Sequence, residues 1–156
     1  MASVPSVESL SGTLIALLVD AAFVFAEPTA NPLPTYENPL VARLTIEHGE
    51  TWGLCVCVQD KLGQMLAANL LGTESETGEA RDAAADAVGE LANIMAGAVA
   101  VELFGKDVVC HIGIPVVAIE TGRLAGNYLT QSTCCVNLST EEGYALSVAL
   151  TAQGGA

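Results

Sequence analysis

The feature that most constrains this chain is residues 82–104, DAAADAVGELANIMAGAVAVELF, which predict one long helix. Alanine, leucine, methionine and glutamate favour helix, and no proline interrupts the stretch. At about 100° per residue, five positions fall into one narrow, mostly polar stripe: Asp82, Asp86, Glu90, Asn93 and Gly97. The opposite side predicts an apolar face for a core, formed by Val88, Leu91, Met95, Ala98 and Val99.

Two residues of the polar stripe are candidates for chemistry. Glu90 and Asn93 are three positions apart, so a carboxylate and an amide would stand side by side and face outward. Gly97 lies on the same stripe, where glycine costs about 1 kcal/mol relative to alanine, so we expect another backbone to approach closely there. An ordinary solvated helix face has the same polar character. The spacing alone therefore leaves a functional site and a plain surface both open.

Composition predicts one globular domain and argues against several classes of partner. The chain has 156 residues, of which 51% are hydrophobic and 15% charged, which is enough apolar material for a core. Its net charge of −13 would repel both nucleic acid and an anionic membrane surface. Residues 10–26 are apolar, but no Lys or Arg precedes them and Asp20 interrupts them. We therefore expect a buried helix there rather than a signal peptide or a membrane span.

The five cysteines predict free thiols in a reducing cytoplasm. An odd count without a Cys-x-x-Cys motif gives neither a disulfide framework nor a zinc knuckle. A thiol or metal site built from Cys55, Cys57, Cys110 and His111 remains an alternative. Small core residues in an apolar strand are the commoner interpretation, so we expect no disulfide and no metal.

The order of elements predicts an α+β fold over residues 1–156, a largely antiparallel sheet with long helices on one side. A first helix over 7–26, capped near Ser11, precedes a proline-rich connector at 27–39. Strands at 40–47 and 52–59 would form a hairpin, followed by a helix at 61–71 capped by Asp60. A polar loop at 73–78 leads to the long helix. Beyond it we expect extended runs at 108–114 and 116–121, a loop at 123–127, and a last hairpin from 128–138 and 144–151.

Motifs around the long helix resemble the CheX branch of the CheC-type chemotaxis phosphatases. The resemblance is carried by Asp86-x-x-x-Glu90-x-x-Asn93, by the IMAG that follows, and by Pro115 in HIGIPVVAIETG. The 21 residues between Asn93 and Pro115 suit the long gap that the family places before its proline. CheC itself carries two Glu-x-x-Asn helices, and the first helix here has no asparagine. The pattern is therefore similar to the single-site CheX proteins.

This resemblance implies a phosphatase that hydrolyses the aspartyl-phosphate of a CheY-like response regulator. Asn93 would orient the attacking water, and Glu90 would pair with a lysine of the regulator, which supplies the Mg²⁺. Asp86 and Pro115 would support the site by shaping the helix face and the adjoining strand. An amide can donate and accept hydrogen bonds at once, which suits it to hold water in line with phosphorus.

The resemblance also implies a cytoplasmic homodimer that pairs through the sheet, and an apolar strand set leaves an edge that needs cover. The alternative function is a non-catalytic module of the same fold that docks on a response regulator or a flagellar component.

Overall fold

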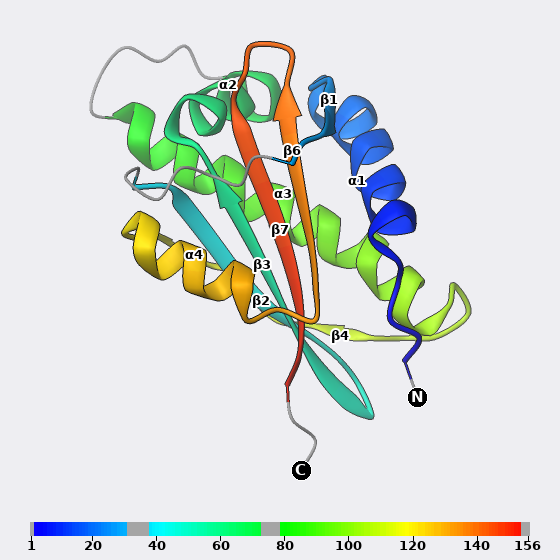
Figure 1. Ribbon diagram of the computed structural model, residues 1–156. Helices are drawn as coiled ribbons and strands as arrows, with labels where there is room; N and C mark the ends of the chain where they lie inside the picture. The colour runs from blue at the N-terminus through cyan, green and yellow to red at the C-terminus, as the bar shows by residue number, and fades with distance from the viewer. Residues whose placement is uncertain (1, 31–37, 73–78, 154–156) are drawn as a thin grey trace.

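The fold is built on one seven-stranded sheet in which every strand pair is antiparallel (Figure 1). We describe it from a computed structural model that covers residues 2–30, 38–72 and 79–153. The strand order is β1-β6-β7-β3-β2-β4, and β5 also pairs with β2. The bounds of the strands are β1 Ala26–Pro28, β2 Leu40–His48, β3 Glu50–Val58, β4 His111–Ile112, β5 Val116–Ile119, β6 Cys134–Thr140 and β7 Ala145–Gln153.

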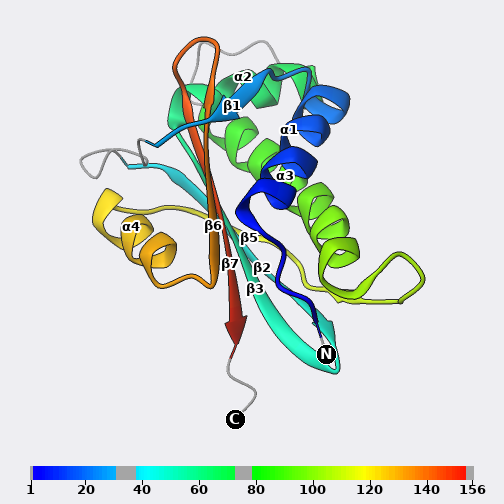
Figure 2. The same cartoon turned by 45° about the vertical axis from the view of Figure 1, so that its right-hand side comes forward.

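Three longer helices cover one face of the sheet and a short one lies on the other, as the edge-on view in Figure 2 shows. The longer helices are α1 (Val7–Ala22), α2 (Asp60–Leu71) and α3 (Glu79–Phe104), and the short one is α4 (Gly122–Thr130). The predicted α+β fold with long helices on one side of an antiparallel sheet is confirmed.

Strand alternation divides the interior into two layers. Along β2, Ala42, Leu44 and Ile46 point toward the long helices, whereas Val41 belongs to a smaller cluster on the opposite face. The same alternation holds on β3, where Cys55 and Cys57 join that smaller cluster. Successive side chains of a strand face opposite sides of a sheet, so this division follows from the register.

Helix α3 is the central element of the main core. The apolar face predicted for it is largely buried, since Val88, Leu91, Met95 and Val99 are all inaccessible to solvent. Its stretch Asp82–Phe104 is long and apolar enough to cross a membrane, but half of the most apolar part of this stretch is buried inside the fold. Core helices of globular proteins share these properties, and the outward stripe of this helix is polar.

The first helix is shorter than predicted and is capped elsewhere. It ends at Ala22, because Phe23 adopts a left-handed conformation (φ 56°) and its backbone N–H bonds back to Leu18 and Val19. Residues 26–28 then form β1 instead of helix or connector. The N-cap is Ser6, whose side chain accepts a hydrogen bond from the Ser9 N–H, and not Ser11, which is buried inside the helix. The connector residues 31–37 and the loop at 73–78 lie outside the described residues.

The hairpin and the second helix follow the prediction closely. Strands β2 and β3 meet at Gly49, whose φ of 73° makes the tight turn that a side chain would strain. Helix α2 ends as expected at Gly72, also left-handed. It begins one residue early, with Asp60 as its first helical residue and Gln59 as its cap.

The prediction was wrong in the region after β5. A loop was expected at 123–127 and a strand from 128, but helix α4 spans both. Thr121 starts this helix, because its side chain accepts a hydrogen bond from the Leu124 N–H at 3.1 Å. Its glycines and asparagine lower helix propensity, so the local sequence gives little sign of a helix. The extended run at 108–114 is likewise reduced to the two residues of β4, and β6 begins only at Cys134.

The N-terminal segment is tied to the hairpin by a single carboxylate. The Oε1 atom of Glu50 accepts hydrogen bonds from the Trp52 indole N–H at 2.9 Å and from the Ala2 backbone N–H at 3.0 Å. These bonds, the indole bond first, lower the pKa of Glu50 below its ordinary value, because they stabilise the charged form. The contribution to stability is therefore present above the ordinary glutamate pKa and is lost as pH falls through the lowered one.

We predict that Trp52 fluorescence reports this contact. Trp52 is the only tryptophan of the chain, so an acid titration of the folded protein should show a spectral change at a pH below the ordinary glutamate range. Glu50→Gln should remove that transition, because the amide does not titrate. An identical transition in the Glu50→Gln protein would assign it to another carboxylate.

Candidate functional site

The candidate site is an open cavity of about 250 Å³ between the outer side of α3 and the segment that runs into β5. Helix α3 contributes Asp86, Gly89, Glu90 and Asn93, and the segment contributes Pro115 and Val117. The structure thus brings together Asp86, Glu90, Asn93 and Pro115, the residues that carry the motif in the sequence.

The helix positions the polar side chains because its other side is fixed in the core. Asp82, Asp86, Glu90 and Asn93 are all exposed, while Leu91 and Ala92, between the last two, are buried. Rotation of α3 about its axis would expose that apolar face, so burial holds the stripe outward. Glu90 and Asn93 therefore stay accessible to solvent and to another protein.

The opposite wall comes from the break between β4 and β5. The Gly113 N–H donates to the Thr45 carbonyl at 2.8 Å, and four residues later Val117 pairs with Ala42, so the chain stays on β2 across the break. Successive side chains of this segment therefore face opposite sides of the sheet. Pro115 and Val117 line the cavity beside α3, whereas Ile114 and Val116 line a pocket on the opposite face of the sheet.

The close backbone approach expected at Gly97 is not found, and the tight contact of an α3 glycine is with a side chain, at Gly89. A Cβ atom at Gly89 would lie 3.2 Å from Cγ2 of Val117, whereas a Cβ at Gly97 would meet nothing within 4 Å. Gly89 is thus the position where α3 and β5 come close, on the floor of the cavity. In the sequence, Gly89 is simply another glycine inside the predicted helix 82–104, and its neighbour Val117 belongs to a strand whose register the sequence does not determine.

The cavity offers carboxylates and an amide without forming a metal site. Asp86 and Glu90 give it negative charge, and Asn93 adds a group that can both donate and accept. Within the described residues, no group of three or more histidine, cysteine or acidic side chains is placed to hold a metal ion. The arrangement can hold a water molecule and contact a cationic side chain.

The structure does not bring together all four residues of the alternative thiol or metal site, Cys55, Cys57, Cys110 and His111. Cys55 and Cys57 belong to the small cluster beside α4, whereas Cys110 packs against the main core on the other side of the sheet. The structure shows Cys55, Cys57, Cys110, Cys134 and Cys135 as free thiols.

A comparison with known protein families assigns the chain to one of them. Residues 44–149, which include the cavity, match the family described as chemotaxis phosphatase CheX. The chain belongs to this family. A comparison with curated protein sequences finds no match.

Solved structures of CheX and CheC-like proteins share the fold at low sequence identity. A chain of the CheX–CheY–BeF3–Mg²⁺ complex from Borrelia burgdorferi is 15% identical, with a TM-score of 0.71 over 97% of this chain and 100% of that one. Chemotaxis protein CheX from Vibrio vulnificus is 16% identical, with a TM-score of 0.64 over 90% and 93%. A CheC-like protein from Shewanella is 16% identical, with a TM-score of 0.62 over 95% and 97%.

We predict opposite consequences for alanine at the two glycines of α3. Gly97→Ala should raise the free energy of unfolding by about 0.5–1 kcal/mol, since helix propensity improves and nothing is displaced. Gly89→Ala should gain less or lose stability, because Val117 must move. Urea denaturation of both variants measures the difference. Equal gains would show that α3 and β5 are not in close contact at Gly89.

Proposed function

We propose that this chain accelerates hydrolysis of the aspartyl-phosphate on a CheY-like response regulator. The observation that carries the proposal is the cavity on α3, where Glu90 and Asn93 stand exposed within a region that matches the CheX family. The Borrelia burgdorferi relative was solved in a complex with CheY, BeF3 and Mg²⁺, which supports a partner of this type.

In this proposal the site acts by positioning. Asn93 enters the active site of the regulator and holds the attacking water in line with phosphorus, accepting one hydrogen bond from it and donating another to a neighbouring oxygen. Phosphoryl transfer asks a protein mostly for such placement and for charge neutralisation. The regulator supplies the phospho-aspartate, the Mg²⁺ and a lysine, so this chain needs no cofactor of its own.

Glu90 contributes to docking through its charge. It lies one helical turn before Asn93 and lines the same cavity, so both side chains reach the regulator from one direction. Its carboxylate pairs with the lysine of the regulator, and Asp86 adds negative charge one turn further away. Pro115 and Val117 give this acidic surface an apolar border. The substrate is a cytoplasmic signalling protein, and we expect this protein in the same compartment.

The mutational test separates the two side chains. Asn93→Ala should lower turnover on the order of 10²-fold with little change in affinity, because it removes a group that acts as the transition state forms. Glu90→Ala should weaken docking and also slow the reaction. Both side chains are exposed, so melting temperatures should change little. The measurement is decay of a phosphorylated regulator with purified variants.

Asp82→Ala is the matched control. Asp82 is an exposed acidic residue of the same stripe, about 16 Å along the helix from Asn93 and outside the cavity. It should leave both turnover and docking unchanged. Wild-type turnover in a folded Asn93→Ala protein would reject the catalytic assignment and favour the non-catalytic docking module.

We also propose that the protein is a homodimer paired through the β4/β5 edge of the sheet. Four apolar side chains of this edge segment are strongly exposed: Val109 at 90%, Ile114 at 89%, Val116 at 63% and Ile119 at 52%. β4 and β5 flank β2 at this edge of the sheet, and a second copy would cover such apolar groups and pair with open backbone.

Analytical ultracentrifugation at micromolar concentration should show a dimer. Ile114→Glu should shift it toward monomer, because a charge would be buried in the interface. Val7→Glu, at an exposed apolar residue of α1, is the control and should leave the dimer intact. A monomeric wild-type protein would contradict the proposal.

A further inference from the structure

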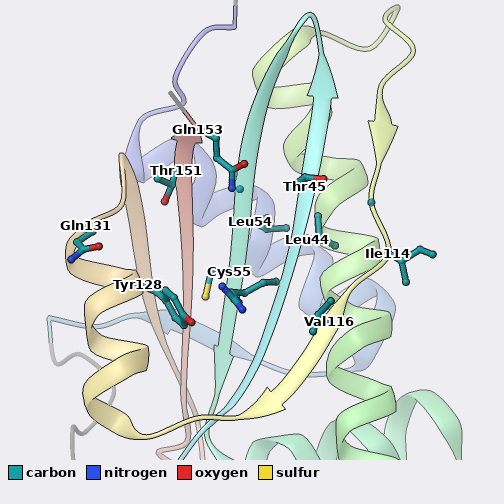
Figure 3. A pocket seen from close by; sticks show the side chains of 13 residues that line it. Leu44, Thr45, Leu54, Cys55, Ile114, Val116, Tyr128, Gln131, Thr151 and Gln153 are labelled. Carbon is teal, nitrogen blue, oxygen red and sulfur yellow. The ribbon is translucent and has the colours of Figure 1, made fainter. Parts of the chain in front are cut away.

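A second cavity, larger than the one beside Glu90 and Asn93, lies on the face of the sheet away from α3, between α4 and the segment that contains β4 and β5 (Figure 3). Its volume is about 520 Å³. Strands β2, β3 and β7 form its floor, and the side chains of Tyr128 on α4 and of Gln131, the residue that ends this helix, form one wall. Neither the Glu90 and Asn93 site nor the proposed phosphatase reaction uses this space.

A thiol lies on that floor. Cys55 lines the cavity with 8% of its surface exposed, and Figure 3 shows its sulfur beside the ring of Tyr128. The strand register places Arg43 directly across from it on β2 and Ala149 across from it on β7. The Arg43 guanidinium stacks over Tyr128, 4.8 Å from the ring centre, which keeps it at the mouth of the cavity near the sulfur.

A second thiol lies next to the first on the same strand. Cys57, two residues along the strand, is fully buried, and its sulfur lies 3.8 Å from that of Cys55. Its hydrogen bond with Cys55 and its burial raise the pKa of Cys57 and keep it protonated, so it can donate its S–H to Cys55. The hydrogen bond from Cys57 and the charge of Arg43 lower the pKa of the Cys55 thiol, against the opposing effects of burial and of Glu120.

The neighbouring thiols behave in the opposite way. The pKa of Cys57 is raised far above its ordinary value by the hydrogen bond to Cys55 and by burial. Burial also raises the pKa of Cys134 and of Cys135. Thiolate is the reactive form of cysteine, and reactive cysteines lie in electropositive, partly open surroundings. Among these four thiols, Cys55 alone combines a lowered pKa with a place in the lining of the cavity beside a cationic side chain.

We propose that Cys55 is a modification site, where a small hydroperoxide that enters the cavity oxidises the thiolate to a sulfenic acid. The sulfur lone pair attacks the terminal peroxide oxygen and forms the S–O bond as the O–O bond breaks. The leaving alkoxide or hydroxide takes a proton from water. Sulfur is oxidised by two electrons, and the peroxide is reduced by two to an alcohol or water.

The oxidation stops at Cys55 and does not proceed to a disulfide with Cys57. The two Cα atoms are two residues apart on an extended strand, about 6.6–6.8 Å, which is the upper limit for a disulfide. The sulfur atoms would have to approach from 3.8 Å to about 2.05 Å. Strand β3 is paired with β2 and β7 on its two sides, so its backbone resists that movement.

The test uses the whole folded protein, hydrogen peroxide below one equivalent, and dimedone, a carbon nucleophile that traps sulfenic acids. Trypsin separates the thiols, because Cys55 and Cys57 fall in peptide 44–61, Cys110 in 107–123, and Cys134 and Cys135 in 124–156. The label should appear first in 44–61, and fragment masses should place it on Cys55.

Two variants test the environment of the thiol. Arg43→Gln removes the charge at an exposed position, and Cys57→Ala removes the hydrogen-bond donor. Each should slow Cys55 labelling several-fold at neutral pH and move the pH profile of its alkylation by iodoacetamide upward, since the thiolate fraction falls about tenfold per pKa unit. Cys135→Ser is the control and should leave the rate unchanged.

Three results would overturn the proposal. Label that appears first in 107–123 or 124–156 would assign the reactive thiol elsewhere. Equal rates in wild type and the folded Arg43→Gln protein would show that the cavity does not activate Cys55. Labelling of Cys55 no faster in the native protein than in urea would mean that burial, or a second copy seated over the cavity, closes the site.

Discussion

The packing of α3 against the central strands is the interaction on which the rest of the structure depends. Four of its side chains, Val88, Leu91, Met95 and Val99, are fully buried against the sheet and the neighbouring helices. Each such side chain contributes about 1.5–3 kcal/mol by leaving water. That burial fixes the rotation of the helix, and the rotation alone decides that Glu90 and Asn93 face outward. The candidate site therefore depends on core residues that do not line it.

The segment that contains β4 and β5 contributes side chains to both faces of the sheet. Because the chain stays against β2 from Gly113 through β5, its side chains alternate across the sheet plane. Pro115 and Val117 complete the cavity beside α3, while Ile114 and Val116 border the cavity above Cys55. A single short segment thus forms a wall of two unrelated cavities. A substitution in this segment can therefore affect either cavity.

The family retains this architecture at little sequence identity. Relatives only 15–16% identical keep the fold over nearly the whole chain. Core positions accept many apolar side chains if volume and pattern are kept, so identity falls quickly there. The motif residues Asp86, Glu90 and Asn93 are exposed, so substitutions there should change stability little, and the fold does not require these side chains. The Cys55 cavity lies on the other face of the sheet, away from them.

The sequence by itself determined the elements whose signals are local. The long helix and its polar stripe follow from an apolar period of 3.6 residues, and the β2–β3 hairpin from alternation around Gly49. The motif of Asp86, Glu90, Asn93 and Pro115 was visible because three of its members share one helix face. Family membership could therefore be inferred from the amino-acid sequence.

Only the tertiary structure decided what depends on contacts between distant segments. Helix α4 has weak intrinsic propensity and is supported by its cap and by packing on β3 and β7, so its local sequence predicts a loop. The close contact belongs to Gly89 and not to Gly97, because it depends on where β5 lies. The pairing of Arg43 with Cys55 is a matter of register between strands, and a shift of one residue would send each side chain to the other face.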